Sequence, residues 1–323
     1  MDWSCLIRNK ESLCVSTDTR NLPAGCVFFA LHGATFDGNT FAAQALEQGA
    51  SVAVIDNPEY AIEGKTILVP DTLLALQELA REWRRTLNIP IIAITGTNGK
   101  TTTKELTAAV LATRYKVHYT QGNLNNQIGV PLTLLQLTRA HEIAIIEMGA
   151  SHPGDIKELV EIAEPTCGLI TNVGRAHLQG FGSFEGVMNT KAELYDYLRQ
   201  HDGFIFRNTD NPYLAQMAGE LQTMAYTTGT MPEQSHLVGA YNAENVSAAI
   251  CVGTHFGIPY QQALEAVCAY EPSNKRSQLL QTARNTIVVD AYNANPTSMQ
   301  AAINAFKGDT YILGEMRELG EYS

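Results

Sequence analysis

The sequence predicts an α/β protein built around a mainly parallel sheet with helices on both faces. From residue 89 onward, short apolar segments alternate regularly with helical ones, as they do in parallel sheets. The first of these apolar segments runs directly into a loop with glycines, a lysine and hydroxyl residues, and a helix follows. A smaller α/β segment precedes this central domain, and a short β-α-β segment comes after it.

The first domain is predicted over residues 1–88. Strands are expected at 26–31, 51–55 and 66–69, and helices at 40–48 and 71–87. The second helix carries an apolar stripe and has Asp71 near its start. Its polar end, residues 84–88, marks the expected boundary with the next domain.

The central domain is predicted over residues 89–272. Its strands are expected at 89–95, 116–119, 142–148, 167–173 and 203–207. Its helices are expected at 104–113, 128–137, 153–163, 184–199, 212–222, 242–256 and 260–269. Ligands of such sheets bind at the carboxyl ends of the strands, so the loop after residue 95 lies where a ligand is expected.

Residues 273–323 are predicted to begin a third domain. A strand is expected at 285–291, a helix at 296–306 and a second strand at 310–313. A single crossover of about 50 residues cannot bury a core of its own, so this domain is expected to be incomplete.

Composition limits the classes of function. The chain of 323 residues has a net charge of -11, which argues against a nucleic-acid backbone as partner. Its 6 cysteines are scattered without a C-x-x-C pair, as expected for free thiols in a reducing compartment. No signal peptide is recognisable, and no apolar run approaches the roughly 20 residues of a membrane span. A cytoplasmic location is therefore expected.

The loop at residues 96–102, which reads GTNGKTT, carries the clearest chemistry. Strand, glycine loop, lysine, hydroxyl and helix is the order of a polyphosphate cradle, in which backbone N–H groups face the anion and the hydroxyl reaches Mg²⁺. The common pattern G-x-x-x-x-G-K-[ST] requires a glycine at position 94, where this chain has Ile94. From these residues alone, a nucleotide site and a chance glycine loop both remain open.

Other polar residues lie near the same expected edge of the sheet. Glu147 ends an apolar strand, where a carboxylate suits Mg²⁺ but could also be a capping or solvated group. His177 lies just beyond another strand, and a metal or phosphate role and a structural role both remain open. Lys191 lies in a predicted helix, where the pattern alone indicates a solvated cation. The asparagine-rich turn at 122–129 could contact an anionic substrate, although building the turn is the simpler interpretation.

Taken together, these segments resemble the Mur ligases, the ATP-dependent amide-forming enzymes of bacterial cell-wall synthesis. The similarity rests on several segments in order and covers essentially the whole chain. The segments are 18–20, 28–38 (FFALHGATFDG), 95–102, 122–135, 147–156 (EMGASHPGDI), 171–178, 181–193, 241–249 (YNAENVSAA) and 289–299 (VDAYNANPTSM). The last is most typical of members that join D-alanyl-D-alanine to UDP-N-acetylmuramoyl-tripeptide.

The resemblance implies a central P-loop ATPase domain, a smaller UDP-substrate-binding domain before it and an incomplete Rossmann-like domain after it. Lys100 would bind the β- and γ-phosphates and Thr101 the first Mg²⁺, with Glu147 and His177 as further metal ligands. Lys191 matches a lysine that several relatives carbamylate to support a second Mg²⁺. The other implied contacts are Gly96, Thr97, Asn98, Gly99 and Thr102 in the loop, Asn242 and Asn245 at the adenine, Arg276, Asp290 and Tyr292 at the nucleotide, Asn125 and Asn126 at the substrate, and Thr19 and Arg20 at the uracil.

This chain departs from the family pattern at three points. Tyr241 stands where a histidine is common, and Thr19 replaces the usual serine. The third domain, which carries the incoming amine in the family, extends further there than the part present here.

The implied reaction has two steps. The terminal carboxylate of the tripeptide attacks the γ-phosphate of ATP to give an acyl phosphate and ADP, and the amine of D-alanyl-D-alanine then displaces phosphate. Lys100 and Mg²⁺ would neutralise the charge of the two anions. The chain, expected to be a monomer, should bind ATP and the UDP-linked tripeptide but form the amide weakly or not at all without the rest of the third domain.

Two other interpretations remain open. The chain could be a sister Mur ligase or a folylpolyglutamate-synthase-like ligase, although segment 289–299 and the uridine-like first domain argue against the folate reaction. It could also be a non-catalytic nucleotide-binding module, although the presence of Lys100, Thr101, Glu147, His177 and Lys191 argues against that.

Overall fold

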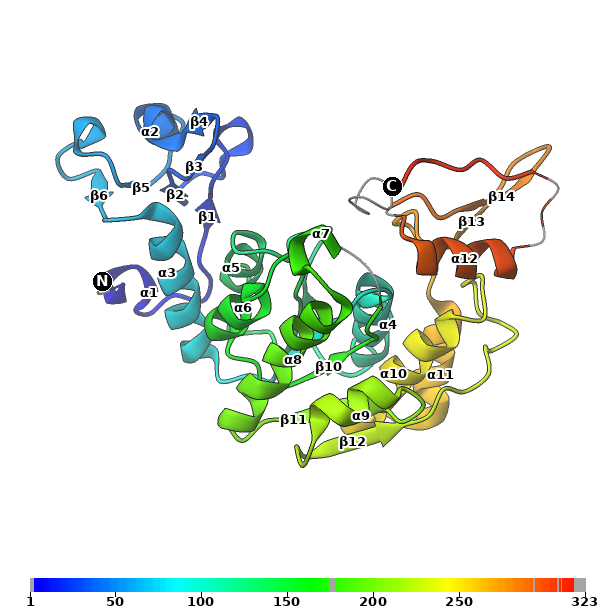
Figure 1. Ribbon diagram of the computed structural model, residues 1–323. Coiled ribbons are helices and arrows are strands. Elements are labelled where there is room, and N and C mark those ends of the chain that lie inside the picture. The colour runs from blue at the N-terminus through cyan, green and yellow to red at the C-terminus, as the bar shows by residue number, and fades with distance from the viewer. Residues whose placement is uncertain (1–2, 175–177, 293, 307, 309, 317–323) are drawn as a thin grey trace. The chain divides into compact units, whose positions relative to one another are not determined.

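The computed structural model describes residues 3–174, 178–292, 294–306, 308 and 310–316 (Figure 1). The chain forms two compact units. The first unit holds residues 1–89, 121–141 and 162–164, and the second holds 90–120, 142–161 and 165–323. The chain therefore returns to its first unit after the second has begun.

The first unit contains a parallel sheet, one long helix and several short ones. Within the described residues, its strands follow the order β1 (Val15–Ser16), β2 (Val27–Phe29), β5 (Val52–Ile55) and β6 (Thr66–Leu68), and all neighbours are parallel. The hairpin β3 (His32–Gly33) and β4 (Phe36–Asp37) is separate. The helices are α1 (Ser4–Ile7), α2 (Ala42–Glu47), α3 (Thr72–Leu87) and α5 (Gly129–Leu135), with 3-10 turns at Thr19–Asn21, Gly38–Phe41 and Pro58–Tyr60.

Helix α3 shows how the sequence specifies this unit. The Asp71 side chain accepts a hydrogen bond from Leu74 N at 2.8 Å and caps the helix, as its position predicted. Asn88 ends the helix in the left-handed conformation, with φ of 45°. The apolar stripe of α3 packs against α5, and Trp83 Nε1 donates to Leu137 O at 3.0 Å. Residues 121–141 thereby complete the core of the first unit.

The second unit is organised by a larger parallel sheet. Within the described residues its strand order is β12-β11-β10-β7-β9-β8, and every neighbouring pair is parallel. The strands are β7 (Ile91–Thr95), β8 (Val117–Tyr119), β9 (Ile143–Glu147), β10 (Cys167–Ile170), β11 (Phe204–Asn208) and β12 (Thr223–Tyr226). The helices are α4 (Lys100–Leu111), α6 (Asp155–Ala163), α7 (Leu178–Phe181), α8 (Phe184–Gln200), α9 (Pro212–Ala218), α10 (Asn242–His255) and α11 (Tyr260–Ala269).

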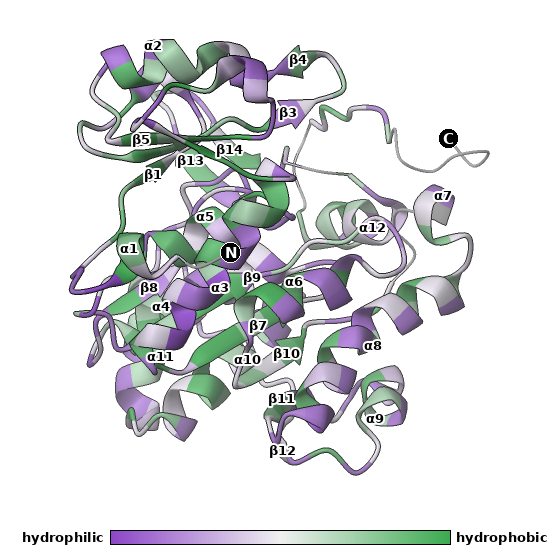
Figure 2. Cartoon of the chain, turned by 90° about the vertical axis from the view of Figure 1, so that its left-hand side faces the viewer, coloured by the Kyte–Doolittle hydropathy of each residue, from purple (hydrophilic) through white to green (hydrophobic). Residues whose placement is uncertain are grey.

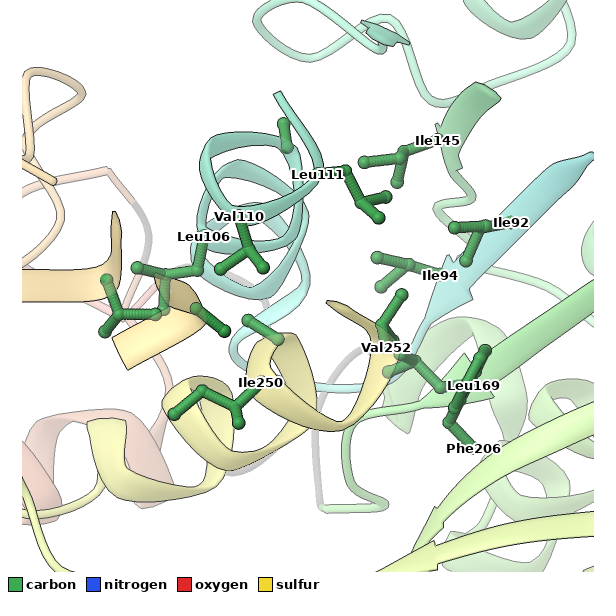
Figure 3. Close-up of a cluster of buried hydrophobic side chains, with 14 of the residues drawn as sticks. Ile92, Ile94, Leu106, Val110, Leu111, Ile145, Leu169, Phe206, Ile250 and Val252 are labelled. Carbon is green, nitrogen blue, oxygen red and sulfur yellow. The ribbon is translucent and has the colours of Figure 1, made fainter. Parts of the chain in front are cut away.

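The core of the second unit lies between the sheet and helices α4, α10 and α11. Alternate strand residues such as Ile92, Ile94 and Leu169 face Val110 and Val252 on the helices (Figure 3). Helix α8 contacts β7, β10 and β11. In Figure 2 the central strands are coloured as hydrophobic, while helices α6 and α8 carry hydrophilic residues. The prediction of a parallel sheet covered by helices on both faces is confirmed.

The last part of the second unit contains an antiparallel pair and a helix. Strands β13 (Gln278–Gln281) and β14 (Thr286–Val289) pair with each other, and α12 (Pro296–Ala305) follows. Asn295 caps α12 in a capping box with Ser298.

The structure corrects several predicted elements. Residues 310–313 form no strand in the described part of the chain, because a strand needs a paired neighbour, and Ile312 is 96% exposed. Helix α4 begins at Lys100 instead of residue 104, and β10 ends at Ile170 instead of residue 173. Helix α9 ends at Ala218, since Gly219 adopts φ of 53° and the following residues form β12, which was not predicted. None of the helices among the described residues is long and apolar enough to cross a membrane.

Candidate active site

The phosphate-type loop connects β7 to α4 at the carboxyl edge of the sheet. Gly99 is the N-cap of α4 with φ of 81°, and no side chain caps the helix. The first-turn N–H groups of α4 are therefore the kind that bind an anion. A Cβ at Gly96 would lie 2.0 Å from Thr171 Oγ1, and one at Gly99 2.4 Å from Asn245 Oδ1. Both glycines are thus required by close packing as well as by backbone conformation.

Residues after β10 hold the loop in place. Asn172 O accepts from Thr97 N at 3.0 Å, and Asn172 Oδ1 accepts from Asn98 N at 3.0 Å. Thr171 Oγ1 donates to Asn98 O at 2.6 Å, and Gly174 N donates to Thr97 Oγ1 at 2.9 Å. These contacts explain why β10 ends early. Sequence reasoning missed the bracing role of Thr171 and Asn172, although a Thr-Asn pair directly after a buried strand was a usable signal.

Helix α10 supports the same loop from a second direction. Asn245 Oδ1 accepts from Thr103 Oγ1 at 2.9 Å, and Asn245 Nδ2 donates to Asn242 Oδ1 at 2.9 Å. Asn242 Nδ2 in turn donates to Val238 O at 2.8 Å. The structure therefore brings Asn242 and Asn245 together beside the loop.

Lys100 folds back over its own loop. Its Nζ donates to Gly96 O at 2.9 Å and to Thr97 O at 3.1 Å. An ammonium group has three N–H donors, so a further one can bind a phosphate oxygen. Burial lowers the pKa of Lys100; Glu147 opposes this shift and Arg276 adds to it.

Glu147 and Lys104 form a buried pair next to the loop. Glu147 ends β9, pairs in register with Ile94 and is 2% exposed. Lys104 lies one helical turn after Lys100, is 0% exposed and places Nζ 3.7 Å from Glu147 Oε2. Burial lowers the pKa of Lys104, which Glu147 and Glu105 oppose. Sequence reasoning missed Lys104, although its spacing of four residues from Lys100 places both on one helix face.

Lys191 is not a solvated cation, contrary to what its helix pattern indicated. It is 2% exposed, and its Nζ lies 5.7 Å from the centre of the Phe181 ring. Its pKa is lowered to about 7, chiefly by burial and then by the charge of Lys100, while Asp155 and Glu193 oppose the shift. A buried amine with this pKa is largely neutral near physiological pH and is therefore nucleophilic.

Three of the four predicted metal ligands, Thr101, Glu147 and Lys191, lie among the described residues. His177 lies outside the described residues. Among the residues that the structure describes, no three histidine, cysteine or carboxylate side chains gather as a metal cluster. The Thr101 hydroxyl, which is buried, and the Glu147 carboxylate supply hard oxygen ligands. This small oxygen set fits Mg²⁺, which keeps several waters and binds few protein groups.

The predicted nucleotide contacts near the C-terminal segment also lie together. The Arg276 guanidinium lies 3.8 Å from the centre of the Tyr292 ring, and Asp290 Oδ1 accepts from Ser277 N at 3.4 Å. Ser277 Oγ and Tyr241 Oη are 2.6 Å apart. Burial raises the pKa of Asp290, while the Ser277 hydrogen bond and Arg276 oppose the shift.

One further contact ties this segment to the loop. Asn295 Nδ2 donates to Asn98 Oδ1 at 2.8 Å. Sequence reasoning did not single out Asn295, although it lies inside the segment 289–299 that carried the resemblance.

The predicted substrate contacts lie in the first unit. Thr19 and Arg20 belong to a 3-10 turn, where Arg20 pairs with Asp18 and lowers the pKa of that carboxyl to about 2. Asn126 Oδ1 accepts from Gly129 N at 2.9 Å and from Ile128 N at 3.2 Å, so this side chain builds the turn before α5. Asn125 lies in the same turn, in the segment 121–141 that returns to the first unit.

An anion-binding helix start at the carboxyl edge of a parallel sheet, with buried lysines and a buried carboxylate beside it, defines a P-loop-type nucleotide-binding α/β protein. Comparison with family descriptions matches residues 94–230 to the Mur ligase middle domain and residues 13–84 to the Mur ligase family, catalytic domain. The chain belongs to the Mur ligase family.

Individual relatives agree with this assignment. The UDP-N-acetylmuramoyl-tripeptide–D-alanyl-D-alanine ligase of Bacillus subtilis is 39% identical over 340 residues, which cover 95% of this chain and 74% of that protein. The crystal structure of MurF from Acinetobacter baumannii matches with a TM-score of 0.84 and 31% identity, over 96% of this chain and 75% of the other. MurF ligase from Thermotoga maritima in complex with ADP matches with a TM-score of 0.85 and 28% identity, over 97% and 79%. The predicted family and fold class are confirmed.

Proposed function

We propose that this protein is an ATP-dependent, ADP-forming ligase that joins D-alanyl-D-alanine to UDP-N-acetylmuramoyl-tripeptide in peptidoglycan precursor synthesis. The observation that carries the proposal is the glycine loop at the start of α4, with Lys100 folded over it and Glu147 and Lys191 buried beside it. The relative from Bacillus subtilis bears the name of this reaction, and the relative from Thermotoga maritima was solved with ADP. The first supports the same substrates here, and the second supports an adenine nucleotide at this site.

The residues of the loop suit the first step of such a reaction. A carboxylate must approach a triphosphate, so two anions have to be brought together. The N–H groups at the start of α4 and the Lys100 ammonium would stabilise the charge that develops on the transferred phosphoryl group. The tripeptide carboxylate gains the γ-phosphoryl group and ADP leaves. The amine of D-alanyl-D-alanine then forms the amide bond while phosphate leaves.

Mg²⁺ would be held by the Thr101 hydroxyl and the Glu147 carboxylate. When bound, it would polarise the phosphoryl oxygens and neutralise their charge. Lys191, whose burial favours the neutral amine, would take up CO₂ to become a carbamate, an anionic oxygen ligand for a second Mg²⁺.

We assign the remaining contacts as follows. Arg276, Asp290 and Tyr292 would contact the nucleotide, together with Asn242 and Asn245 beside the loop. Thr19, Arg20, Asn125 and Asn126, all in the first unit, would contact the UDP-linked substrate. We further propose that the protein acts as a monomer in the cytoplasm, where ATP and UDP-linked precursors occur.

The test is a substrate panel with ADP release as readout. We expect ADP release that requires the UDP-linked tripeptide, and amide formation that also requires D-alanyl-D-alanine. Phosphate transfer to a shorter UDP-linked peptide or to a folate would identify a sister ligase instead. Nucleotide binding without phosphate transfer to any acceptor would indicate a non-catalytic module. A Lys100→Ala variant serves as the control for contaminating ATPase.

A further inference from the structure

Glu105, on the second turn of helix α4, connects the helix of the phosphate loop to a distant segment of the same unit. Its Oε2 accepts hydrogen bonds from the Tyr270 hydroxyl and from Asn274 Nδ2, the latter at 2.8 Å. The Glu105 side chain is 19% exposed, so these bonds are partly shielded from water. Tyr270 follows helix α11 directly, and Asn274 lies four residues later. Helix α4 is thereby attached to the segment 270–277, which carries Arg276.

Asn274 passes this connection on to Arg276. The Asn274 amide donates through Nδ2 to Glu105 and accepts through Oδ1 from Arg276 N at 3.2 Å. One side chain thus joins the Glu105 carboxylate to the backbone of Arg276. No other residue lies between them in this chain of hydrogen bonds.

The backbone around Arg276 needs such support. Lys275 has φ of 60° and Ser277 has φ of 50°, a left-handed conformation that costs energy for residues other than glycine. On the far side, Ser277 is held by Tyr241 Oη at 2.6 Å and by Asp290 Oδ1 at 3.4 Å. On the N-terminal side of Arg276, Asn274 is held in the same way by its hydrogen bond to Glu105.

This fixed backbone directs the Arg276 side chain. Its guanidinium stacks on the Tyr292 ring at 3.8 Å, which leaves the N–H edges of the guanidinium available for an anion. Arg276 also acts electrostatically on Lys100 and Lys104, whose pKa values it lowers further after burial has done so. Its positive charge therefore reaches the region of the phosphate loop.

We infer that Glu105 is a positioning residue for nucleotide binding, which acts through Asn274 to hold Arg276 toward the polyphosphate. The inference rests on the proposed function, in which Arg276 contacts the nucleotide. It adds a connection between two phosphate-binding groups: helix α4, which begins at the loop, also fixes the position of Arg276. Glu105 itself touches neither nucleotide nor metal in this proposal.

The experiment measures the dissociation constant of Mg²⁺-ADP by calorimetry for a set of variants of the whole chain. We expect Glu105→Ala to weaken ADP binding about tenfold, the size of effect that follows when a hydrogen bond to a charged group is lost. Asn274→Ala should weaken it by a similar factor. Glu105→Gln should stay within about threefold of the unaltered protein, because its single carbonyl oxygen can accept both bonds. Glu265→Ala, on the exposed face of α11, is the matched control and should have no effect.

A double-mutant cycle separates positioning from a general structural role. If Glu105 acts through Arg276, then Glu105→Ala should have little further effect in an Arg276→Ala background. The inference is wrong if the two effects add in full, or if Glu105→Ala and Asn274→Ala both bind ADP normally. If Glu105→Ala fails to fold, Asn274→Ala in the same cycle decides the question. If Arg276→Ala alone leaves ADP binding unchanged, the nucleotide role assigned to Arg276 under the proposed function is the part that fails.

Discussion

Buried amines are the most informative feature at the scale of single residues. Lys100, Lys104 and Lys191 all have pKa values lowered first by burial, and Lys100 also lowers the pKa of Lys191. Burying several like charges near one another is unfavourable unless an anion compensates them. Glu147 compensates only part of this charge. The residues themselves therefore favour a polyanionic ligand.

The role of Lys100 can be tested by removing its charge. We expect Lys100→Met to lower the rate of ADP formation by about 10²–10³, because a donor aimed at the developing phosphoryl charge is lost. The thermal midpoint should not fall, since an apolar chain of similar length replaces a partly buried ammonium. Steady-state kinetics and calorimetry measure the two quantities. Retention of full activity would contradict the assignment.

The pKa of Lys191 predicts a pH-dependent modification. An amine reacts with CO₂ only when neutral, and a lysine is neutral above its pKa. With a pKa of about 7, Lys191 should be mostly neutral at pH 8, whereas an ordinary lysine is less than about one hundredth neutral there. We expect a carbamate signal in ¹³C NMR after incubation with labelled bicarbonate at pH 8, fading below pH 7. A Lys191→Arg variant should give no such signal. If the unaltered protein also gives no carbamate signal at pH 8, the proposal is wrong.

At the scale of elements, the junction between β7 and α4 depends on local backbone geometry. Gly99 combines a left-handed φ of 81° with a Cβ position blocked by Asn245 Oδ1. The Asn245 side chain is itself held by Thr103 and Asn242, so it cannot move without breaking those bonds. The loop and helix α10 therefore form one packed group.

Alanine substitutions at two glycines separate strain from packing at this junction. Gly64 has a similar φ of 71° but open space around its Cβ position. We expect Gly64→Ala to cost about 1 kcal/mol from backbone strain alone. Gly99→Ala should cost more, roughly 2–4 kcal/mol, and should also abolish ADP binding. Urea unfolding and calorimetry measure both effects, and equal losses of stability in the two variants would show that the contact with Asn245 does not matter.

A buried carboxylate in the first unit predicts how stability responds to acid. Asp56 accepts from Asn39 Nδ2 at 2.8 Å and from Thr72 N at 3.2 Å, and its Oδ2 lies 2.7 Å from His32 Nε2. Burial raises its pKa, but these hydrogen bonds and the His32 charge outweigh burial and leave the pKa below its ordinary value. A group whose folded-state pKa is depressed stabilises the fold above its unfolded pKa, and that contribution is lost as pH falls through the folded pKa.

We therefore expect Asp56→Asn to be less stable than the unaltered protein at pH 7, by about 1–3 kcal/mol. The difference should shrink as the pH falls below about 4, because the unaltered carboxyl then becomes protonated. Urea midpoints of both proteins measure this dependence between pH 2 and pH 7. This range extends roughly two to three pH units on each side of the pH of about 4 below which the difference should shrink. Asp71→Asn is the control, since asparagine also caps helices. A constant difference across the pH range would contradict the explanation.

Helices with a strong periodic apolar pattern were predictable from the sequence. Strands whose existence depends on pairing with a neighbouring strand were not. Helices α3, α8 and α10 lie where their apolar patterns predicted them, within a residue or two. Strand β12 (Thr223–Tyr226) was missed because it is a short edge strand that mixes polar and apolar residues, so it has no clear apolar pattern. Residues 310–313 were predicted as a strand from apolar character alone, which says nothing about pairing.

The site shows the same division. The glycines, Lys100 and Glu147 were recognisable from residue type and position. Lys104 and Glu105 were not, because their importance comes from burial and from contacts with residues far along the chain.

At the scale of the whole molecule, candidate contacts divide between the two units. The loop, Glu147, Lys191 and Arg276 lie in the second unit, whereas Thr19, Arg20, Asn125 and Asn126 lie in the first. Each proposed ligand therefore has its own set of residues. Binding of either ligand should stabilise the unit that contacts it.

Hydrogen exchange can test this division. We expect ADP to protect the amides of α4 and β9, and the UDP-linked tripeptide to protect residues around 19–20 and 125–126. Exchange followed by mass spectrometry, with each ligand alone, gives the comparison. Protection of the loop at 96–102 by the UDP-linked tripeptide, without protection in the first unit, would overturn the assignment of that substrate.

The return of residues 121–141 to the first unit also matters for how the chain is made. During synthesis, helix α3 is complete well before α5 has been added, so the face of α3 that packs on α5 is at first uncovered. The bond from Trp83 Nε1 to Leu137 O can form only after the loop, helix α4 and strand β8 have been made. The unit that begins the chain therefore cannot finish folding until part of the second unit has been made. Completion of the first unit therefore waits for synthesis of the start of the second, and the apolar face of α3 that packs on α5 stays uncovered until then.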